Sequence, residues 1–330
     1  MIERAKVLRT KSFGHSYAAG YWATGLNGCV QQLAANLNAP LSNYAVGGSR
    51  LYHAITAVFQ HPAVVGDLVL FNSGLNDLRL TPYVIDTKTG AKAKNVIRSV
   101  LASTFAKTAV GAQALTVKWP GTWSELHSKS CWLGSGGVQS TAFGQVTEYV
   151  FEGDNVVVGF MSCNGTTSGT LGTTEIYVDN IRVGGFDPNN QTDGTLSEEM
   201  FMPALWGVAS GFGPGKHLLC LKALGNSAIV DWIGTLKAPE DCPQVAICEA
   251  LPLSAAGVVG LGVNAGMIAA LNTAFVDAIK EFKGYPVTFI TVPGYDPATD
   301  SSVEEIHGDD FHPNDGGHAR IFQAHQRLAV

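Results

Sequence analysis

The sequence predicts a three-layer α/β/α domain, built on a doubly wound parallel sheet and interrupted by an inserted β-sandwich. Strand-like and helix-like segments alternate over the first 110 residues, and the same alternation returns after about residue 240. The stretch between them is rich in Gly, Ser and Thr and shows little helical periodicity. We therefore predict an α/β domain made of residues 1–110 and 241–330, with a β-rich module at 111–240.

The first part of the α/β domain starts with an apolar run at residues 5–10, which we predict to be a strand. This run leads through SFGHSYAAG into a helical pattern at 28–39, so Ser16 lies at a turn from strand to helix. A short strand ending in paired glycines (LSNYAVGGSRL) and a helix at 51–60 follow. The apolar run in GDLVLFNSGLND, residues 66–77, is typical of a strand buried on both faces.

The inserted module and the second part of the α/β domain differ in their patterning. The module contains the alternating segments TEYVFEGDNVVVGFM, TEIYVDNIRVGGF and HLLCLKAL, which indicate antiparallel strands. After it, the α/β pattern continues with a strand in PQVAICEALPL, a helix at 264–284, a strand at 285–295 and a final helix at 316–329. A β-module therefore interrupts an α/β domain.

Composition excludes several functional classes. A formal net charge of −6 gives no basic surface for nucleic acid, and no apolar run is long and unbroken enough to predict a membrane span. The start MIERAKVLRT has no hydrophobic signal region, so we expect no exported leader there and leave the localisation open. The six cysteines have no zinc-type spacing, and both free thiols and disulfides fit their positions.

Five residues carry the chemistry that the pattern suggests. Ser16, Gly48 and Asn76 each follow a predicted strand, and the carboxyl ends of parallel strands meet at one edge of a sheet. The segment HGDDFHPNDGGHARIF adds Asp309 and His312 in a loop before the last helix, at a spacing that lets the carboxylate reach the imidazole. Together they supply a nucleophile, a base, an orienting carboxylate and donors for an oxyanion.

These segments resemble the blocks of the SGNH hydrolases, also called the GDSL esterases. SFGHSYAAG looks like the nucleophile block and NYAVGGSRL like the glycine block; SGLNDLR is similar to the GxND block and DDFHPNDGGHARI to the DxxH block. Any one block is weak evidence, but all four occur in the family's order. The resemblance implies a flavodoxin-like sheet and an ester-hydrolysing site.

The resemblance also implies a mechanism for these residues. Ser16 would attack an ester carbonyl while His312 takes its proton and Asp309 holds the imidazole. The oxyanion would be bound by the backbone N–H groups of Ser16 and Gly48 and by the side-chain amide of Asn76. No metal ion and no organic cofactor is expected.

Each of these residues also has a purely structural interpretation. Ser16 could cap a helix, and Gly48 could serve a turn that needs positive φ. Asp310 could orient the histidine in place of Asp309, while we expect Asp77 to be structural. The family usually has Asp before the serine where this chain has His15, and we expect activity to survive that change.

The inserted module is the expected place for substrate choice. Its segment WPGTWSELHSKSCW holds Trp119, Trp123 and Trp132, which fit either a β-sandwich core or a surface that stacks on sugar rings. The combination resembles acetyl esterases that act on polysaccharides, including deacetylases of bacteriophage tail fibres and spikes. We therefore expect an acetylated polysaccharide as substrate, and an oligomer if the chain belongs to such a fibre.

Two other functions fit the same sequence. A lipase or thioesterase for longer acyl chains would need an apolar channel, and no amphipathic lid segment indicates one. A catalytically inactive glycan-binding or tail protein would not need the residue set Asn76, Asp309 and His312, which is intact. Turnover of esters separates these alternatives.

Overall fold

The protein is described here as a computed structural model. It describes residues 3–21, 23–72, 74–80, 87–112, 123–127, 136–140, 142–163, 173–186, 201–225, 229–295 and 312–327. The chain divides into two compact units, one formed by residues 1–85 and 238–330 and the other by residues 86–237. The stretch 86–110, which the sequence pattern grouped with the first part of the α/β domain, thus falls in the second unit.

The first unit contains a parallel sheet of five strands in the order β15-β14-β3-β1-β2. Its strands are β1 (Arg9–Gly14), β2 (Leu41–Asn43), β3 (Asp67–Asn72), β14 (Gln244–Cys248) and β15 (Val287–Ile290). All four neighbouring pairs are parallel. When the strands are numbered along the chain within this unit, their order in the sheet is 2-1-3-4-5. The direction in which strands are added to the sheet therefore reverses at the neighbouring strands β1 and β3. Every residue of β3 is buried, as its continuous apolar pattern indicated.

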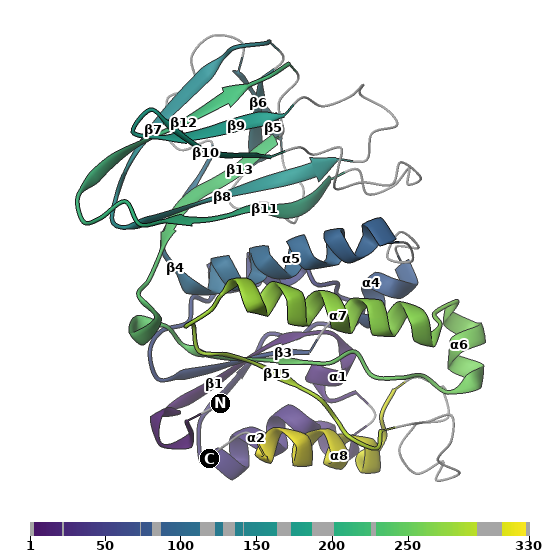
Figure 1. Cartoon of the computed structure of the whole chain (residues 1–330). Helices are drawn as coiled ribbons and strands as arrows, with labels where there is room; N and C mark the ends of the chain where they lie inside the picture. The colour runs from purple at the N-terminus through teal and green to yellow at the C-terminus, as the bar shows by residue number, and fades with distance from the viewer. Residues whose placement is uncertain are drawn as a thin grey trace. The chain divides into compact units, whose positions relative to one another are not determined.

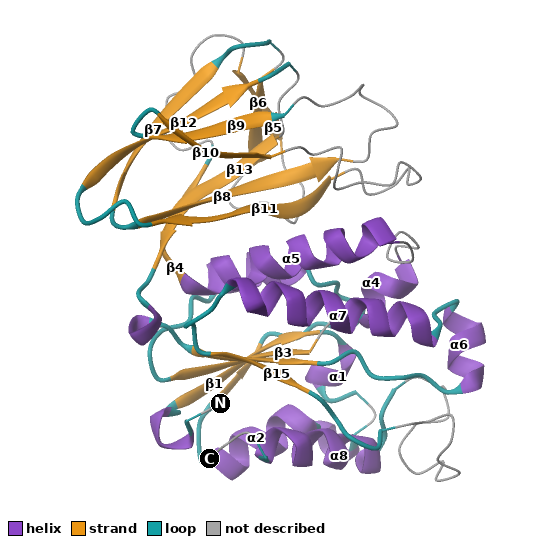
Figure 2. Ribbon diagram, in the orientation of Figure 1, coloured by secondary structure: helices purple, strands orange, loops and turns teal. Residues whose placement is uncertain are grey.

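Helices cover both faces of this sheet. Figures 1 and 2 show α2 and α8 on one face and α7 on the other. The helices of this unit are α1 (Ser16–Ala19), α2 (Cys29–Leu37), α3 (His53–Gln60), α4 (Leu75–Leu80), α6 (Ala255–Leu261), α7 (Ala265–Glu281) and α8 (Asp315–Gln326), with short 3₁₀ turns at Arg4–Lys6, Thr24–Leu26 and Pro239–Asp241. Parallel strands with helices on both faces confirm the predicted α/β class.

The first strand begins later than the sequence pattern predicted. Residues 5–10 were expected to form it, but β1 runs from Arg9 to Gly14 and a 3₁₀ turn occupies Arg4–Lys6. The backbone N–H groups of Leu8 and Arg9 donate to the carbonyl of Gly66, and that of Thr10 donates to Pro40. The start of β1 is therefore determined by hydrogen bonds to the neighbouring segments, and the apolar pattern of the sequence alone does not predict it.

The second unit is an antiparallel β-sandwich with one long helix. One sheet has the order β10-β9-β12-β7, and the other has the order β11-β8-β13-β6-β5, with β4 pairing with β13. The elements are α5 (Thr87–Phe105), β4 (Ala106–Gly111), β5 (Trp123–His127), β6 (Gly136–Ser140), β7 (Val146–Glu152), β8 (Asn155–Cys163), β9 (Thr174–Val178), β10 (Ile181–Phe186), β11 (Phe201–Ser210), β12 (Lys216–Ala223) and β13 (Ile229–Leu236).

The core of the sandwich draws on both sheets. Val158 and Ile233 from one sheet and Ile176 and Leu221 from the other are all fully buried. The rings of Phe160 and Phe186 stack across the core at a centroid distance of 4.5 Å. The β-sandwich module that the sequence indicated is thus present, and α5 packs against β11 within the same unit.

Trp232 of β13 is also buried, beside Gly159 of β8. It is 1% exposed, and a Cβ atom built on Gly159 of the neighbouring strand would lie 1.9 Å from its Nε1 atom. Glycine is therefore needed where the indole lies against the next strand. Trp119 and Trp132 lie outside the described residues, and Trp123 begins β5.

Among the described residues, no helix has the length and apolar character needed to cross a lipid bilayer. Four cysteines in this part of the chain are free thiols and buried, namely Cys29, Cys220, Cys242 and Cys248. Burial raises the pKa of Cys29 to about 12, so this thiol stays protonated.

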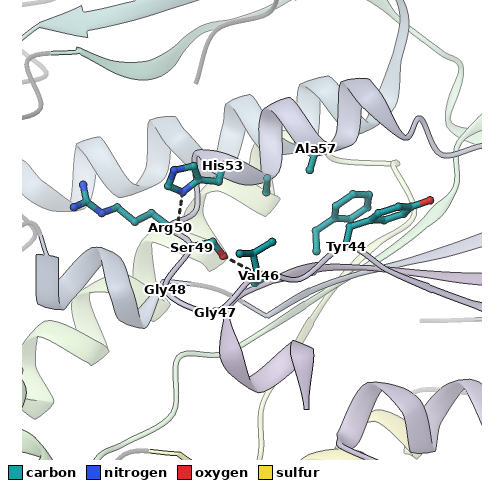
Figure 3. A pocket seen from close by; sticks show the side chains of 11 residues that line it. Tyr44, Val46, Gly47, Gly48, Ser49, Arg50, His53 and Ala57 are labelled. Atoms are coloured by element: carbon teal, nitrogen blue, oxygen red, sulfur yellow. Dashed lines mark hydrogen bonds between the residues drawn. The ribbon is translucent and has the colours of Figure 1, made fainter. Parts of the chain in front are cut away.

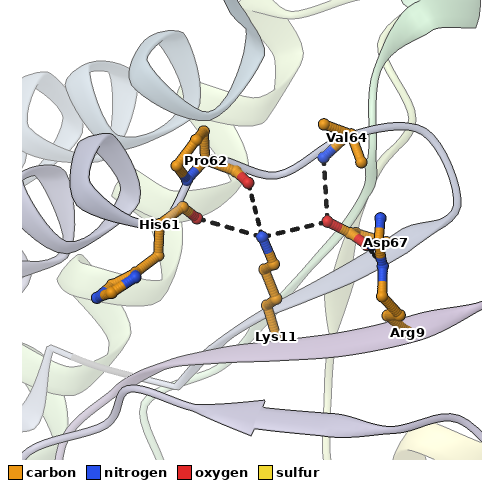
Figure 4. A network of polar contacts seen from close by, with 6 residues as sticks. All are labelled: Arg9, Lys11, His61, Pro62, Val64 and Asp67. Atoms are coloured by element: carbon orange, nitrogen blue, oxygen red, sulfur yellow. Dashed lines mark hydrogen bonds and ion pairs between the residues drawn. The ribbon is translucent and has the colours of Figure 1, made fainter.

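A buried carboxylate joins the starting ends of β1 and β3 (Figure 4). Asp67 is fully buried and accepts hydrogen bonds from Arg9 Nε at 2.7 Å and from the backbone N–H of Val64 at 3.1 Å. Lys11 Nζ lies 3.4 Å from the same carboxylate and donates to the carbonyl of Pro62 at 2.6 Å. These contacts fix the loop before β3 to β1, at the end of the sheet opposite to the predicted site.

We expect Asp67→Ala to lower the free energy of unfolding by about 3 kcal/mol, because it leaves the mostly buried Lys11 ammonium without its counter-charge. The matched control is Arg9→Ala, which should cost less than about 1 kcal/mol since the Arg9 side chain is 53% exposed. Urea unfolding of both variants measures the difference. If both variants lose the same free energy of unfolding, the Asp67–Lys11 pair does not contribute more to stability than the Asp67–Arg9 pair.

Candidate functional site

The site is built around the turn that joins β1 to α1. Ser16 is the first residue of α1, so its backbone N–H has no partner within the helix. His15 precedes it and caps the helix, because its Nδ1 atom accepts a hydrogen bond from the Tyr17 N–H at 3.3 Å. A Cβ atom on Gly14 would lie 2.1 Å from the carbonyl oxygen of Asn72, so only glycine fits where β1 and β3 end side by side.

The structure brings Ser16 and His312 together across 296 residues of sequence. His312 Nε2 lies 2.7 Å from Ser16 Oγ, which is hydrogen-bond distance. Ser16 is 7% exposed, and both side chains line one cavity of about 220 Å³. Asp309 and Asp310 lie outside the described residues, so the orienting role of a carboxylate stays a prediction.

The paired glycines form a tight turn beside Ser16. The Ser49 N–H donates to the carbonyl of Val46, and Gly48 lies between them with φ of +78°. Among the described residues other than its chain neighbours, none has an atom within 4 Å of a Cβ built on Gly48, so the need for glycine there is conformational rather than steric. At Gly47 a Cβ would lie 2.8 Å from the Tyr21 hydroxyl oxygen, so the Tyr21 ring lies against this backbone.

Two side-chain contacts hold the turn in place. Ser49 Oγ donates to the Gly14 carbonyl at 2.7 Å, and Asn76 Nδ2 donates to the Ser49 carbonyl at 3.0 Å. Asn76 belongs to α4 and lines the same cavity as Ser16, Gly48 and His312. The structure thus groups four of the five residues that the sequence selected, and the fifth is Asp309.

Asp77, the neighbour of Asn76, has a structural contact. Its carboxylate is 4% exposed and accepts from the backbone N–H of Leu51, at 3.0 and 3.2 Å for its two oxygen atoms. It therefore joins α4 to the segment that follows the glycine turn.

The helix after His312 is fixed to the segment after Ser16. Asp315 accepts from Thr24 at 2.7 Å for the backbone N–H and at 2.6 Å for the hydroxyl. His318 is fully buried, with Nε2 3.0 Å from the carbonyl of Tyr21 and Nδ1 accepting from the Cys29 N–H at 3.3 Å. These contacts need a neutral His318 with its hydrogen on Nε2, and burial lowers the pKa of this residue.

His15 is the buried titratable residue at the wall of the cavity. Burial lowers its pKa to about 3, and the nearby His312 contributes in the same direction. A group of this pKa is a weak base at neutral pH, so His15 is poorly suited to accept a proton from Ser16.

The aromatic residues around His312 were not singled out from the sequence. Tyr17 is buried and its ring centroid lies 5.7 Å from that of His312, while Tyr21 is 45% exposed at 6.3 Å. Leu75 and Leu261 also line the cavity. Their positions depend on tertiary contacts, and the only sequence signal was the closeness of both tyrosines to Ser16.

A second cavity, of about 330 Å³, shares Gly47 and Gly48 with the first (Figure 3). Its wall is mostly apolar, and Figure 3 shows Tyr44 and Ala57 at one end and Arg50 at the other. The described residues contain no cluster of three or more His, Cys, Asp or Glu side chains placed to hold a metal ion.

The sequence matches no protein-family model and no curated protein. Similar solved structures include a two-domain esterase (CEX) active on acetylated mannans, with 12% identity and a TM-score of 0.36 over 71% of this chain and 93% of that chain. They also include a family 35 carbohydrate binding module from Clostridium thermocellum, with 19% identity and a TM-score of 0.29 over 38% of this chain and 95% of that chain. At these TM-scores the similarities alone establish neither a family nor a substrate.

The contacts of His318 predict a pH dependence of stability. Because the pKa of His318 is lowered in the folded state, the unfolded chain binds the proton first, and stability falls as the pH drops below about 6.5. The slope per such histidine is at most about 1.4 kcal/mol per pH unit. His318→Gln keeps an acceptor and a donor but cannot be protonated. We expect its stability to fall less steeply from pH 6.5 to 5, measured by urea unfolding; parallel curves would contradict the assignment.

Proposed function

We propose that the chain is a serine esterase of the SGNH type that removes O-acetyl groups from a polysaccharide. The observation that carries this proposal is the 2.7 Å contact between Ser16 Oγ and His312 Nε2 inside a cavity at the carboxyl ends of parallel strands. A serine held by an imidazole in this way is the arrangement that activates a hydroxyl nucleophile.

In the proposed reaction, Ser16 Oγ attacks the ester carbonyl carbon and His312 Nε2 takes the hydroxyl proton. The tetrahedral intermediate collapses as His312 returns this proton to the leaving alcohol oxygen, which gives an acyl-enzyme. Water then attacks the acyl-enzyme by the same route and releases the acid. Asp309 is proposed to hold the imidazole and to stabilise its charged form.

The oxyanion has three proposed donors. They are the N–H of Ser16, the N–H of Gly48 and Nδ2 of Asn76. Within the described chain neither backbone N–H donates to another backbone carbonyl, so both are available for a ligand. Asn76 Nδ2 uses one hydrogen for the Ser49 carbonyl, which leaves its second hydrogen for the oxyanion.

The proposed substrate follows from the size and rim of the cavity. A volume of about 220 Å³ with Leu75 and Leu261 in the wall suits a small acyl group. The half-exposed ring of Tyr21 offers a flat apolar face at the same cavity, of the kind on which sugar rings stack. An acetyl ester of a sugar satisfies both features.

One observation favours a second candidate, an esterase for longer acyl chains. The apolar cavity of about 330 Å³ on the other side of the Gly47–Gly48 turn has the volume for an alkyl chain. The third candidate, an inactive glycan-binding or tail protein, gives no reason for the Ser16–His312 contact.

The first test compares p-nitrophenyl acetate, butyrate and octanoate and a panel of acetylated polysaccharides, using the wild type and Ser16→Ala. We expect released acetate, the highest kcat/KM for the shortest ester, and a loss of at least about 10³-fold in Ser16→Ala. Preference for octanoate would favour the second candidate. A folded wild-type protein that turns over none of these esters would overturn the proposal.

The second test addresses the oxyanion donor on α4. Asn76→Ala should lower kcat by about 10² to 10³-fold with a small change in KM, because the donor acts on charge that develops in the transition state. The matched control is Asn272→Ala, whose amide contacts the backbone of Ala250 and does not line the cavity. If both variants lose activity to the same extent, the effect of Asn76 is structural.

A further inference from the structure

His15 has one ring nitrogen that its capping role leaves unused. Nδ1 accepts from the Tyr17 N–H, so in the neutral ring the hydrogen is on Nε2. Burial keeps the pKa of His15 at about 3, and the ring is therefore neutral at pH 7. Nε2 is thus a fixed N–H donor.

This donor borders the cavity. His15 is 3% exposed and lines the same wall as Ser16 and His312. Among the residues that the structure describes, none accepts a hydrogen bond from Nε2. A nearly buried donor without a partner is unfavourable, so a ligand or solvent oxygen is the expected acceptor.

The position of His15 indicates which part of a substrate it meets. The Tyr17 ring contacts both histidines edge-on, with centroid distances of 4.6 Å to His15 and 5.7 Å to His312. His15 and His312 therefore both contact Tyr17 and line the same cavity. In the proposed reaction His312 returns its proton to the leaving alcohol, so we assign the alcohol part of the ester to the part of the cavity near these two histidines.

We propose that His15 is a substrate-binding residue that donates its Nε2–H to a hydroxyl or ring oxygen of the sugar bearing the acetyl group. This inference rests on the proposed esterase function, and it assigns the sugar to the wall formed by His15 and Tyr17. The imidazole then has two roles. Nδ1 caps α1 by accepting from the Tyr17 N–H, and Nε2 donates to the sugar that forms the alcohol part of the ester.

Two substitutions separate these tasks. Asp at this position can accept from the Tyr17 N–H but has no hydrogen to donate, whereas Asn offers both an acceptor and a donor. We expect His15→Asp to lower kcat/KM about tenfold more for an acetylated oligosaccharide than for p-nitrophenyl acetate, mainly through KM, and His15→Asn to restore most of the difference. Equal losses on both substrates would assign His15 to helix capping alone.

A binding measurement keeps this inference distinct from the proposed function. In Ser16→Ala, calorimetry with an acetylated oligosaccharide needs no turnover, and adding His15→Asp should weaken binding about tenfold. Unchanged or undetectable binding overturns the role of His15, whatever the esterase assays show. The opposite result is also distinguishable. If the wild type shows no esterase activity but His15→Asp still weakens oligosaccharide binding, His15 is supported as a sugar contact and the proposed hydrolysis is overturned.

Discussion

The site depends on one constraint, which is that the segment bearing Ser16 and the segment bearing His312 must be held beside each other. The 2.7 Å contact between Ser16 and His312 joins residues from β1–α1 and from the loop before α8. Asp315 and His318 fix α8 to residues 21–29, so the segment bearing the histidine is anchored to the segment following the serine. Three of these four hydrogen bonds, with lengths from 2.7 to 3.3 Å, involve backbone groups of that segment, and the fourth involves the Thr24 hydroxyl.

The sequence was informative where chemistry and backbone conformation coincide. Gly48 has positive φ, and Ser16 and Asn76 follow buried strands, so their places at strand ends, together with the resemblance to the SGNH blocks, predicted their grouping. It was less informative where position depends on tertiary pairing. The start of β1 is set by Gly66 and Pro40, and the capping role of His15 is set by Tyr17. Tyr21 and Leu261 are far apart in the chain and meet only in the folded cavity.

The glycine turn is the shared boundary of two cavities with different character. It is held from β1 through the Gly14 carbonyl and from α4 through Asn76 and Asp77. Because the same contacts position the proposed oxyanion donor of Gly48, the turn has little freedom to open the apolar cavity toward Ser16 without disturbing that donor. Rigidity at this turn thus favours short acyl groups over long ones in the proposed reaction.

The insertion of a complete β-sandwich between residues 85 and 238 has a consequence for biosynthesis. The parallel sheet receives its last two strands, and the site its histidine, only after the whole sandwich has been translated. Contacts of such long sequence separation form slowly and carry a large loop-closure cost. On the ribosome, the sandwich can fold before β14 and β15, the last two strands of the parallel sheet, have been translated. The Ser16–His312 pair therefore forms only after His312 has been translated, so the proposed esterase activity would report completed folding.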